Sequence, residues 1–457
     1  MSSAPVLLDD SAMKRFITDG YIVLKPQMPE GLNEQVYERL EKVIVGRGNP
    51  ENNILPWVPE LRQVLDHPVV DGALRSILGA DYYLHLHRHV HDNRPGSKGQ
   101  KLHKDSLYNS RFAVDDTRRH HRTRWVMLFY YPQDTPLEMG PTAIVPKSQY
   151  LNIDAPTGVD EVALSGEAGT VTLVHYDLLH KGMANRTEKI RYMAKFLFTR
   201  MSEPKAPSWN HTTPHWDSDG DPQEGIWRHV WDWHCGASDT ESPSASDSVE
   251  ALAGRLGDDS EIAGLSAAYE LGLRGEESLP ALISALKSDV PAVSRNAAYA
   301  FNNIGSPAVP YLLNSTRDEN ERVRARALDI LGDMGLSAGA ALAGLTDALL
   351  DEAPDPRRRA AEALGVAGQQ SGGFGAALGA RLENDENGEV RRNAALSLAR
   401  LGPDAGDALS ALEKGLMDSN HYVRGYSVHA LSRIGTPAAN EILLGYLQTL
   451  RWDWEQH

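Results

Sequence analysis

The residues of this 457-residue chain whose types and spacing fit a chemical role are two histidines, an aspartate and an arginine. His103 and Asp105 stand two positions apart, His180 follows later, and Arg191 lies eleven residues beyond His180. Two imidazoles and one carboxylate on one face of a metal ion leave three coordination positions open, which is the ligand set of non-haem Fe(II) oxygenases. An arginine can clamp a carboxylate through two parallel hydrogen bonds. We therefore predict a catalytic metal site at His103, Asp105 and His180, with Arg191 binding a co-substrate.

Short strands must position these residues. Side chains two apart on a strand point to the same side, so His103 and Asp105 are expected to face one metal from one strand end. His180 is expected in the turn after a strand at 169–176. Helices are expected in part of 12–45 and over 61–78. The strand candidates are short, β-branched or aromatic, and bounded by Gly and Pro: 20–24, 82–91, 124–131, 169–174 and 191–198. Several such strands favour a sandwich or barrel.

The N-terminal half resembles the phytanoyl-CoA dioxygenase (PhyH-like) family of Fe(II)/2-oxoglutarate oxygenases over roughly residues 10 to 205. The resemblance rests on the four residues above and on residues 16–24 (FITDGYIVL), 138–142 (EMGPT) and 145–149 (VPKSQ). It departs from the family where Lys147 and Gln149 replace the usual Gly and His.

The resemblance implies a double-stranded β-helix (a jelly roll, cupin-like) with flanking helices. It also implies a dioxygenase that uses Fe(II), 2-oxoglutarate and O₂ to hydroxylate its substrate. In the family, 2-oxoglutarate chelates the iron and its far carboxylate meets an arginine, which is Arg191 in this chain. Asp105 favours hydroxylation, because related halogenases have a small residue in place of the carboxylate.

Further polar side chains surround the predicted site. His85, His87, His89 and His91 alternate along one strand. They fit a hydrated or hydrogen-bonded face better than a second metal site, but His89 or His91 would touch substrate or co-substrate if this face lines the barrel. His175 fits a strand position, and Lys104 is expected to point away from the metal.

The segment from residue 92 to residue 124 contains nine Lys and Arg and four Asp, which gives it a net charge of +5. This segment would attract an anionic substrate, although a solvated loop explains it equally well.

The second half is a repeat array. Matching segments begin at Val293, Val323, Pro356, Val390 and Val423, spaced 30, 33, 34 and 33 residues apart. Apolar residues follow four and eight positions later, and each segment closes on a glycine, at Gly305, Gly335, Gly368, Gly402 and Gly435. These offsets keep one apolar stripe on a helix that the glycine ends. A further apolar helix precedes each segment, so helix pairs stack into an all-α solenoid that resembles HEAT repeats of the short kind also found in phycobilin lyases.

An arginine stands near the start of each segment: Arg295, Arg324, Arg357, Arg391 and Arg424. The interpretation we favour is that they pair with the acidic turns just before them, such as residues 318–321. The alternative is a ridge that binds phosphate. The charge distribution argues against it, because residues 1–235 carry a net −3 and the remainder −13. That acidic half makes nucleic acid or an anionic membrane an improbable partner.

Composition indicates a globular chain of two domains, with 41% hydrophobic and 24% charged residues. The single cysteine, Cys235, excludes an internal disulfide and fits a reducing, cytoplasmic compartment. No signal peptide and no membrane span are predicted. We place an oxygenase domain at 1–235, a polar linker at 236–248 and a repeat domain at 249–457. A Trp-rich stretch at 206–235 is expected to pack on the barrel or at the domain junction.

The sequence therefore predicts an iron- and 2-oxoglutarate-dependent hydroxylase of a small organic molecule. One alternative keeps this chemistry but makes the substrate a protein, peptide or carrier-bound group that the HEAT repeats recruit. The repeats would otherwise contact a partner protein or the chain's own barrel, since fold alone does not decide. A second alternative, a scaffold whose barrel has lost activity, conflicts with the intact His103, Asp105, His180 and Arg191.

Overall fold

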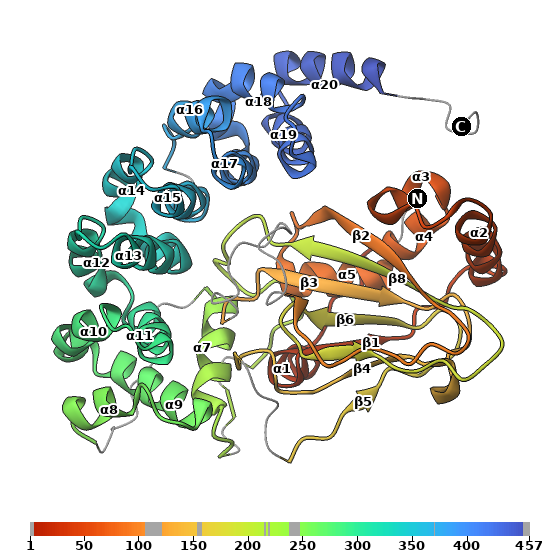
Figure 1. Cartoon of the computed structure of the whole chain (residues 1–457), viewed down its shortest axis with the longest axis horizontal. Coiled ribbons are helices and arrows are strands. Elements are labelled where there is room, and N and C mark those ends of the chain that lie inside the picture. The colour runs from red at the N-terminus through yellow and green to blue at the C-terminus, as the bar shows by residue number, and fades with distance from the viewer. Residues whose placement is uncertain are drawn as a thin grey trace. The chain divides into compact units, whose positions relative to one another are not determined.

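The structure is a computed structural model that describes residues 4–105, 121–152, 158–213, 216–217, 220–236, 247–369 and 371–450. It divides into two compact units, Met1–Ala237 and Ser238–His457. Each unit has its own core. The two are therefore described separately, the first for its β-sheets and the second for its helix pairs (Figure 1).

Two antiparallel sheets form the first unit (Figure 1). The larger has the order β1 (Tyr21–Leu24), β6 (Val171–His175), β3 (Trp125–Tyr130), β8 (Arg191–Thr199) and β2 (Tyr83–Asn93). The smaller has the order β5 (Val162–Ala163), β4 (Thr142–Ile144) and β7 (His180–Gly182). Buried side chains of both sheets, such as Phe129, Leu197 and Ile144, share one hydrophobic core. Two sheets facing each other across a common core confirm the predicted jelly-roll class.

Helices flank these sheets. They are α1 (Asp10–Asp19), α2 (Leu32–Arg47), α3 (Ile54–Trp57), α4 (Leu61–Leu65), α5 (Pro68–Leu78) and α7 (Glu224–His234), with 3₁₀ turns η1 (Glu51–Asn53) and η3 (Leu137–Met139). The prediction of one helix over 61–78 is wrong, because α4 ends at Leu65 and α5 begins at Pro68. His67, the residue before the proline, is extended, as the proline ring requires.

The Trp-rich stretch packs within the first unit. Trp209, Trp227 and Trp231 are buried, which agrees with the predicted packing role. Asp10, the first residue of α1, accepts hydrogen bonds from Trp209 Nε1 at 2.6 Å, His211 Nδ1 at 2.9 Å and the backbone N–H of Thr212 at 2.8 Å. Burial raises the pKa of Asp10, but these hydrogen bonds outweigh it and hold the pKa well below its usual range. The stretch is thereby tied to the first helix of the unit.

The second unit is all-helical in its described residues. One layer holds α8 (Val249–Arg255), α10 (Leu279–Leu286), α12 (Val309–Ser315), α14 (Leu342–Ala348), α16 (Gly375–Asn384), α18 (Leu409–Gly415) and α20 (Pro437–Thr449). The other holds α9 (Glu261–Leu273), α11 (Pro291–Ile304), α13 (Glu321–Asp333), α15 (Pro354–Ala367), α17 (Gly388–Leu401) and α19 (His421–Ile434) (Figure 1). Short 3₁₀ turns join several pairs: η4 (Gly275–Ser278), η5 (Ser306–Ala308), η6 (Gly335–Ala341) and η7 (Gly402–Ala408). The predicted helix-pair repeat is confirmed.

The closing glycines lie at the helix ends as predicted, and four of the five have a positive φ. Gly305, Gly335, Gly402 and Gly435 have φ between 59° and 72°, the left-handed region that a glycine enters without strain. Gly368 differs, since its φ is −82°. A Cβ built on Gly368 would lie 2.5 Å from the carbonyl oxygen of Leu364, so close backbone approach explains that glycine instead.

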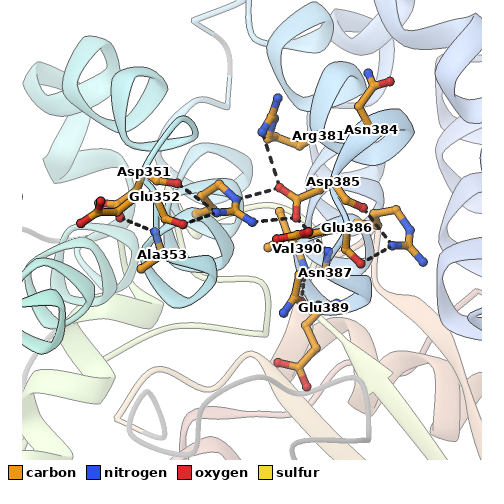
Figure 2. A network of polar contacts seen from close by, with 12 residues as sticks. Asp351, Glu352, Ala353, Arg381, Asn384, Asp385, Glu386, Asn387, Glu389 and Val390 are labelled. Carbon is orange, nitrogen blue, oxygen red and sulfur yellow. Dashed lines mark hydrogen bonds and ion pairs between the residues drawn. The ribbon is translucent and has the colours of Figure 1, made fainter.

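A ladder of arginine–aspartate pairs joins successive repeats. The Nε and Nη2 of Arg357 donate to the Asp385 carboxylate at 2.8 and 3.0 Å. Its Nη1 donates to the carbonyl oxygens of Asp351 and Glu352 at 2.9 and 3.0 Å. Figure 2 shows this network around Asp385, with Arg381 at 3.5 Å as a second cation. The same pattern recurs at Arg324 with Asp351 and at Arg391 with Asp418.

This ladder corrects one prediction. For Arg324, Arg357 and Arg391, the turn before the helix supplies carbonyl oxygens, whereas the carboxylate comes from the turn of the following repeat. One guanidinium group therefore joins two successive repeats. Because these three guanidinium groups are already paired with carboxylates, they do not form the phosphate-binding ridge of the alternative interpretation.

Candidate metal centre

Three predicted ligands come together in the first unit. One ligand atom each from His103, Asp105 and His180 lies within 4.8 Å of the other two, and these form the one such group of His, Cys, Asp or Glu in the described part of the chain. Oδ1 of Asp105 lies 3.9 Å from Nε2 of His103 and 3.8 Å from Nε2 of His180. One cation can therefore contact all three atoms.

The two histidines are held by a backbone bridge. The N–H of His103 donates to the carbonyl of His180 at 2.9 Å, and the N–H of His180 donates back at 2.9 Å. His180 therefore begins strand β7, and the prediction that it lies in a turn is wrong. Asp105 lies outside both sheets, so the expectation that it shares a strand end with His103 is also wrong.

Both imidazoles present the same nitrogen to the centre. Nδ1 of His103 lies 2.8 Å from the carbonyl oxygen of Lys101, and Nδ1 of His180 lies 2.9 Å from that of Leu178. Because a carbonyl oxygen only accepts, each Nδ1 carries a proton, and the neutral form of each ring has its lone pair on Nε2. Burial lowers the pKa of His180 to about 4, against the opposing effect of Asp105, so this ring is neutral at physiological pH. Neutral imidazoles and an ionised carboxylate are the donor set that a divalent cation requires.

Lys195 is the part of the centre that the sequence reasoning missed. Its ammonium forms an ion pair with Oδ2 of Asp105. Burial raises the pKa of Asp105, but Lys195, His180 and His103 outweigh it and keep the pKa well below its usual range. A signal was available, because Lys195 stands four residues after Arg191 on one strand and so shares its face.

Arg191 is a buried cation aimed into the same unit. Its side chain is 3% exposed, and its Nε donates to the carbonyl of Gly140 at 3.1 Å. Its Nη1 has no hydrogen-bond partner among the described residues, and none of their carboxylates pairs with it. A Cβ built on Gly182 would lie 3.9 Å from Nη2, so the guanidinium lies beside the strand that His180 begins. Since a buried charge is costly unless it is paired, this guanidinium fits an anionic ligand.

The strand of four histidines is irregular. The register of β2 against β8 shifts between Leu84 and Arg88, so the expected single face is interrupted. His85 is buried against the Trp125 ring at 5.4 Å. His89 and His91 pair with Lys195 and Met193, and cross-strand partners share a face. Burial and the nearby Lys195 lower the pKa of His91. Its imidazole is therefore neutral, and its cross-strand partner Met193 lies between Arg191 and Lys195 on β8.

Two other predictions agree with the structure. His175 ends β6 and takes no part in the three-ligand group. Lys104 points away from it, since its buried ammonium donates to the carbonyl oxygen of Ser148 at 2.6 Å and to that of Leu151.

The predicted basic segment is less available than its charge suggests. Residues 106–120 lie outside the described part of the chain. Arg124 is buried and donates to the Glu203 carboxylate at 2.9 and 3.0 Å, and Arg94 pairs with Asp92 at 3.0 Å. Arg122 is buried beside Trp233. These cations are used within the fold.

The departures from the family pattern have structural explanations. Lys147 has a φ of 63°, a conformation that favours glycine, and its ammonium pairs with Asp221 at 2.7 Å. The Gln149 amide donates to the carbonyl oxygens of Ile17 and Thr18 at 2.9 and 3.0 Å. Both side chains secure neighbouring segments and neither belongs to the three-ligand group.

Comparisons with known proteins agree with the two units. Residues 16–193 match the model of the phytanoyl-CoA dioxygenase (PhyH) family. Residues 279–365 and 375–456 match the model of HEAT repeats. The predicted resemblance of the first half to this oxygenase family, followed by HEAT repeats, is therefore confirmed. The comparison with curated proteins gives no match.

Solved structures similar to this chain include non-haem, alpha ketoglutarate dependent enzymes. The alpha ketoglutarate dependent epimerase SnoN from nogalamycin biosynthesis is 15% identical, covers 42% of this chain and 83% of its own, and has a TM-score of 0.35. The carbocyclase SnoK from the same biosynthesis is 17% identical, with coverages of 44% and 88% and a TM-score of 0.36. EctD from S. alaskensis, solved with 2-oxoglutarate and 5-hydroxyectoine, is 17% identical, with coverages of 46% and 82% and a TM-score of 0.36.

In the described residues, no helix combines the length and apolar character that a membrane crossing needs.

Proposed function

We propose that this protein is a non-haem Fe(II)- and 2-oxoglutarate-dependent dioxygenase that hydroxylates, or otherwise oxidises, a C–H bond of a small organic molecule. His103, Asp105 and His180 would hold the iron, and Arg191 would bind the far carboxylate of 2-oxoglutarate. The observation that carries the proposal is the convergence of two Nε2 atoms and Oδ1 within reach of one cation, in a segment that matches an oxygenase family. Bound iron and 2-oxoglutarate supply the activation of O₂.

Arg191 supports this co-substrate. The strand residues His180 and Gly182 are two apart, about 7 Å along a strand, and the Arg191 guanidinium lies beside Gly182. A dicarboxylate that chelated the metal at one end would therefore have a cation in the same part of the site for its far carboxylate. The free Nη1 supplies a donor, and the buried position strengthens a charge-assisted hydrogen bond.

The protein contributes fixed geometry and partial burial of the three ligands. The bridge between His103 and His180 and the two Nδ1 hydrogen bonds orient the rings before the metal binds. The shared core beneath them includes Phe129, whose ring centroid lies 6.2 Å from that of His180 and covers one side. Substrate would enter where the three ligands leave positions open, and the chain selects the C–H bond by placing it there.

Charge balance favours an anionic substrate. Lys195 and Arg191 bring two positive charges and Asp105 one negative charge, while Asp92 is already paired with Arg94. Iron(II) and 2-oxoglutarate cancel each other. The surplus of one positive charge in a buried site would attract a carboxylate, phosphate or similar group. Weaker substrate binding at higher salt is expected, and an affinity independent of salt contradicts this assignment.

The match to HEAT repeats supports a second candidate, in which the same chemistry acts on a protein, peptide or carrier-bound group. A solenoid offers an extended surface for such a partner. Deleting residues 249–457 separates the two candidates: turnover of a small substrate is retained, whereas turnover of a docked macromolecule falls.

The test of the activity itself is succinate formation from 2-oxoglutarate with Fe(II) and O₂. Wild type is expected to form succinate slowly even without substrate, and His103→Ala to form none. His421→Ala, an exposed histidine of the second unit, is the matched control and keeps the wild-type rate. A wild-type protein that neither binds Fe(II) nor consumes 2-oxoglutarate contradicts the proposal.

A further inference from the structure

Lys195 is a buried lysine whose ammonium faces the candidate metal centre. Its side chain is 5% exposed, and it lies at the middle of β8. The strand pairs on both sides there, with Phe129 of β3 and His89 of β2 opposite Lys195. In the described residues, Asp105 is the single carboxylate that its ammonium contacts. A rigid strand thus presents one cation to one ligand.

The two oxygens of Asp105 have different neighbours. Oδ1 faces Nε2 of His103 at 3.9 Å and Nε2 of His180 at 3.8 Å. Oδ2 faces Lys195. His103 and His180 are joined by a backbone bridge, whereas Asp105 lies outside both sheets and outside that bridge, so the sheet backbone does not fix it. Its carboxylate is instead fixed by what holds Oδ2.

We propose that Lys195 is a positioning residue that holds Oδ2 of Asp105, so that the carboxylate offers the metal one oxygen, Oδ1. This inference rests on the proposed metal site. A carboxylate can bind a cation through one oxygen or two, and binding through two would take a position that a chelating co-substrate and O₂ need. The ion pair with Lys195 occupies the second oxygen and prevents that. It also keeps the carboxylate turned toward the two rings before a metal arrives, which lowers the entropy lost on binding.

The test measures Co(II) affinity of the full chain by anaerobic titration, with Co(II) as a spectroscopic probe for Fe(II). Lys195→Met keeps the length of the side chain and removes the charge. It is expected to weaken Co(II) binding by about 10- to 100-fold, the usual cost of removing a group that orients a metal ligand. Lys195→Arg keeps the charge with a larger head group and is expected to give an affinity between the two.

The matched control is Lys181→Met. Lys181 follows His180 directly but pairs with Glu161 at 2.8 Å, away from Asp105. Its Co(II) affinity is expected to stay within about twofold of wild type, since an exposed ion pair contributes little. The melting temperature of each metal-free variant is measured alongside. A purely structural role for Lys195 would lower that temperature and leave the affinity of the folded protein unchanged.

The outcomes separate this inference from the proposed function. If wild type binds Co(II), His103→Ala loses it and Lys195→Met keeps it or binds it more tightly, then the inference is wrong and the metal site stands. Tighter binding would mean that Lys195 competes with the metal for Asp105. If wild type binds no Co(II), the metal site and this inference fail together. If Lys195→Met does not fold, Lys195→Arg decides: a Co(II) affinity below that of wild type supports the inference, and an affinity equal to wild type contradicts it.

Discussion

The arginine–aspartate ladder of the second unit allows a quantitative prediction. Asp385 is 1% exposed and Arg357 is 9% exposed, and two parallel hydrogen bonds of 2.8 and 3.0 Å join them. Asp385→Ala leaves the Arg357 guanidinium buried without a carboxylate, which costs about 3–5 kcal/mol. It also removes the acceptor of the Asn387 N–H at 3.0 Å. A unit of this size loses roughly 2–4 °C in melting temperature per kcal/mol, so the expected loss is roughly 6–20 °C.

The assay is thermal unfolding of the full chain followed by helical circular dichroism. Glu352→Ala is the control, because Glu352 is 91% exposed and lies 3.7 Å from Arg324. Its expected effect is within about 0.5 kcal/mol. Because neighbouring repeats stabilise each other, Asp385→Ala is also expected to broaden the transition. If the two variants unfold at the same temperature, the buried pairs do not hold the repeats together.

The same pair predicts a pH dependence with a definite sign. Burial raises the pKa of Asp385, but the hydrogen bonds from Arg357 and the Asn387 N–H, together with the positive charges of Arg357 and Arg381, outweigh it, so the pKa in the folded state is below the usual value. A lowered pKa contributes stability that is present above the unfolded pKa of about 4 and disappears as the pH falls through the folded pKa. The difference in stability between wild type and Asp385→Ala should therefore be full at pH 7 and shrink below about pH 4. A difference that grows on acidification contradicts this reasoning.

Three further predictions concern the first unit. Arg191→Met should raise the KM for 2-oxoglutarate by about 30-fold or more, because a buried charge-assisted contact is worth 2 kcal/mol or more. Gly140→Ala should raise the same KM, because φ is 70° and the new Cβ would lie 2.6 Å from Asn93 Nδ2 and from the Met183 carbonyl, displacing the carbonyl that accepts from Arg191. Asp10→Ala should lower the free energy of unfolding in urea by roughly 2 kcal/mol at pH 7 and by less below pH 4, since hydrogen bonds hold the pKa of Asp10 low.

Local patterns in the sequence predicted much of this architecture. The strands around Ile22, Phe129 and Phe196 and the helix-pair repeat are confirmed, because alternation and helical spacing are properties of one segment at a time. The break between α4 and α5 is also predictable from the sequence, because a proline at position 68 cannot continue a helix from the preceding residues. The closing glycines followed from the need for a positive φ at a helix end.

Partners across the fold were harder to predict. The sequence pattern pairs Arg357 with the acidic turn just before it, but its carboxylate partner, Asp385, is 28 residues further along the chain. Stacking of helix pairs brings the following turn closer in space than the preceding carboxylates, and no pattern within a segment reveals that. The shift in β2 between Leu84 and Arg88 was hidden for the same reason, because a register depends on the strand alongside.

The candidate site also combines features that one segment of sequence predicts with contacts between distant segments. His103 and His180 hold each other through a backbone bridge, so two residues far apart in sequence become one rigid pair. Asp105 has no such anchor, although the two-residue spacing from His103 suggested one. Its Oδ2 pairs with Lys195, which stands ninety residues later on β8. The spacing of a histidine and an aspartate therefore predicts the proposed ligands, whereas the strand that carries Arg191 and Lys195 supplies the two cations that we propose hold the carboxylate and the co-substrate. A variant of this strand should alter metal and co-substrate binding while the three ligands remain intact.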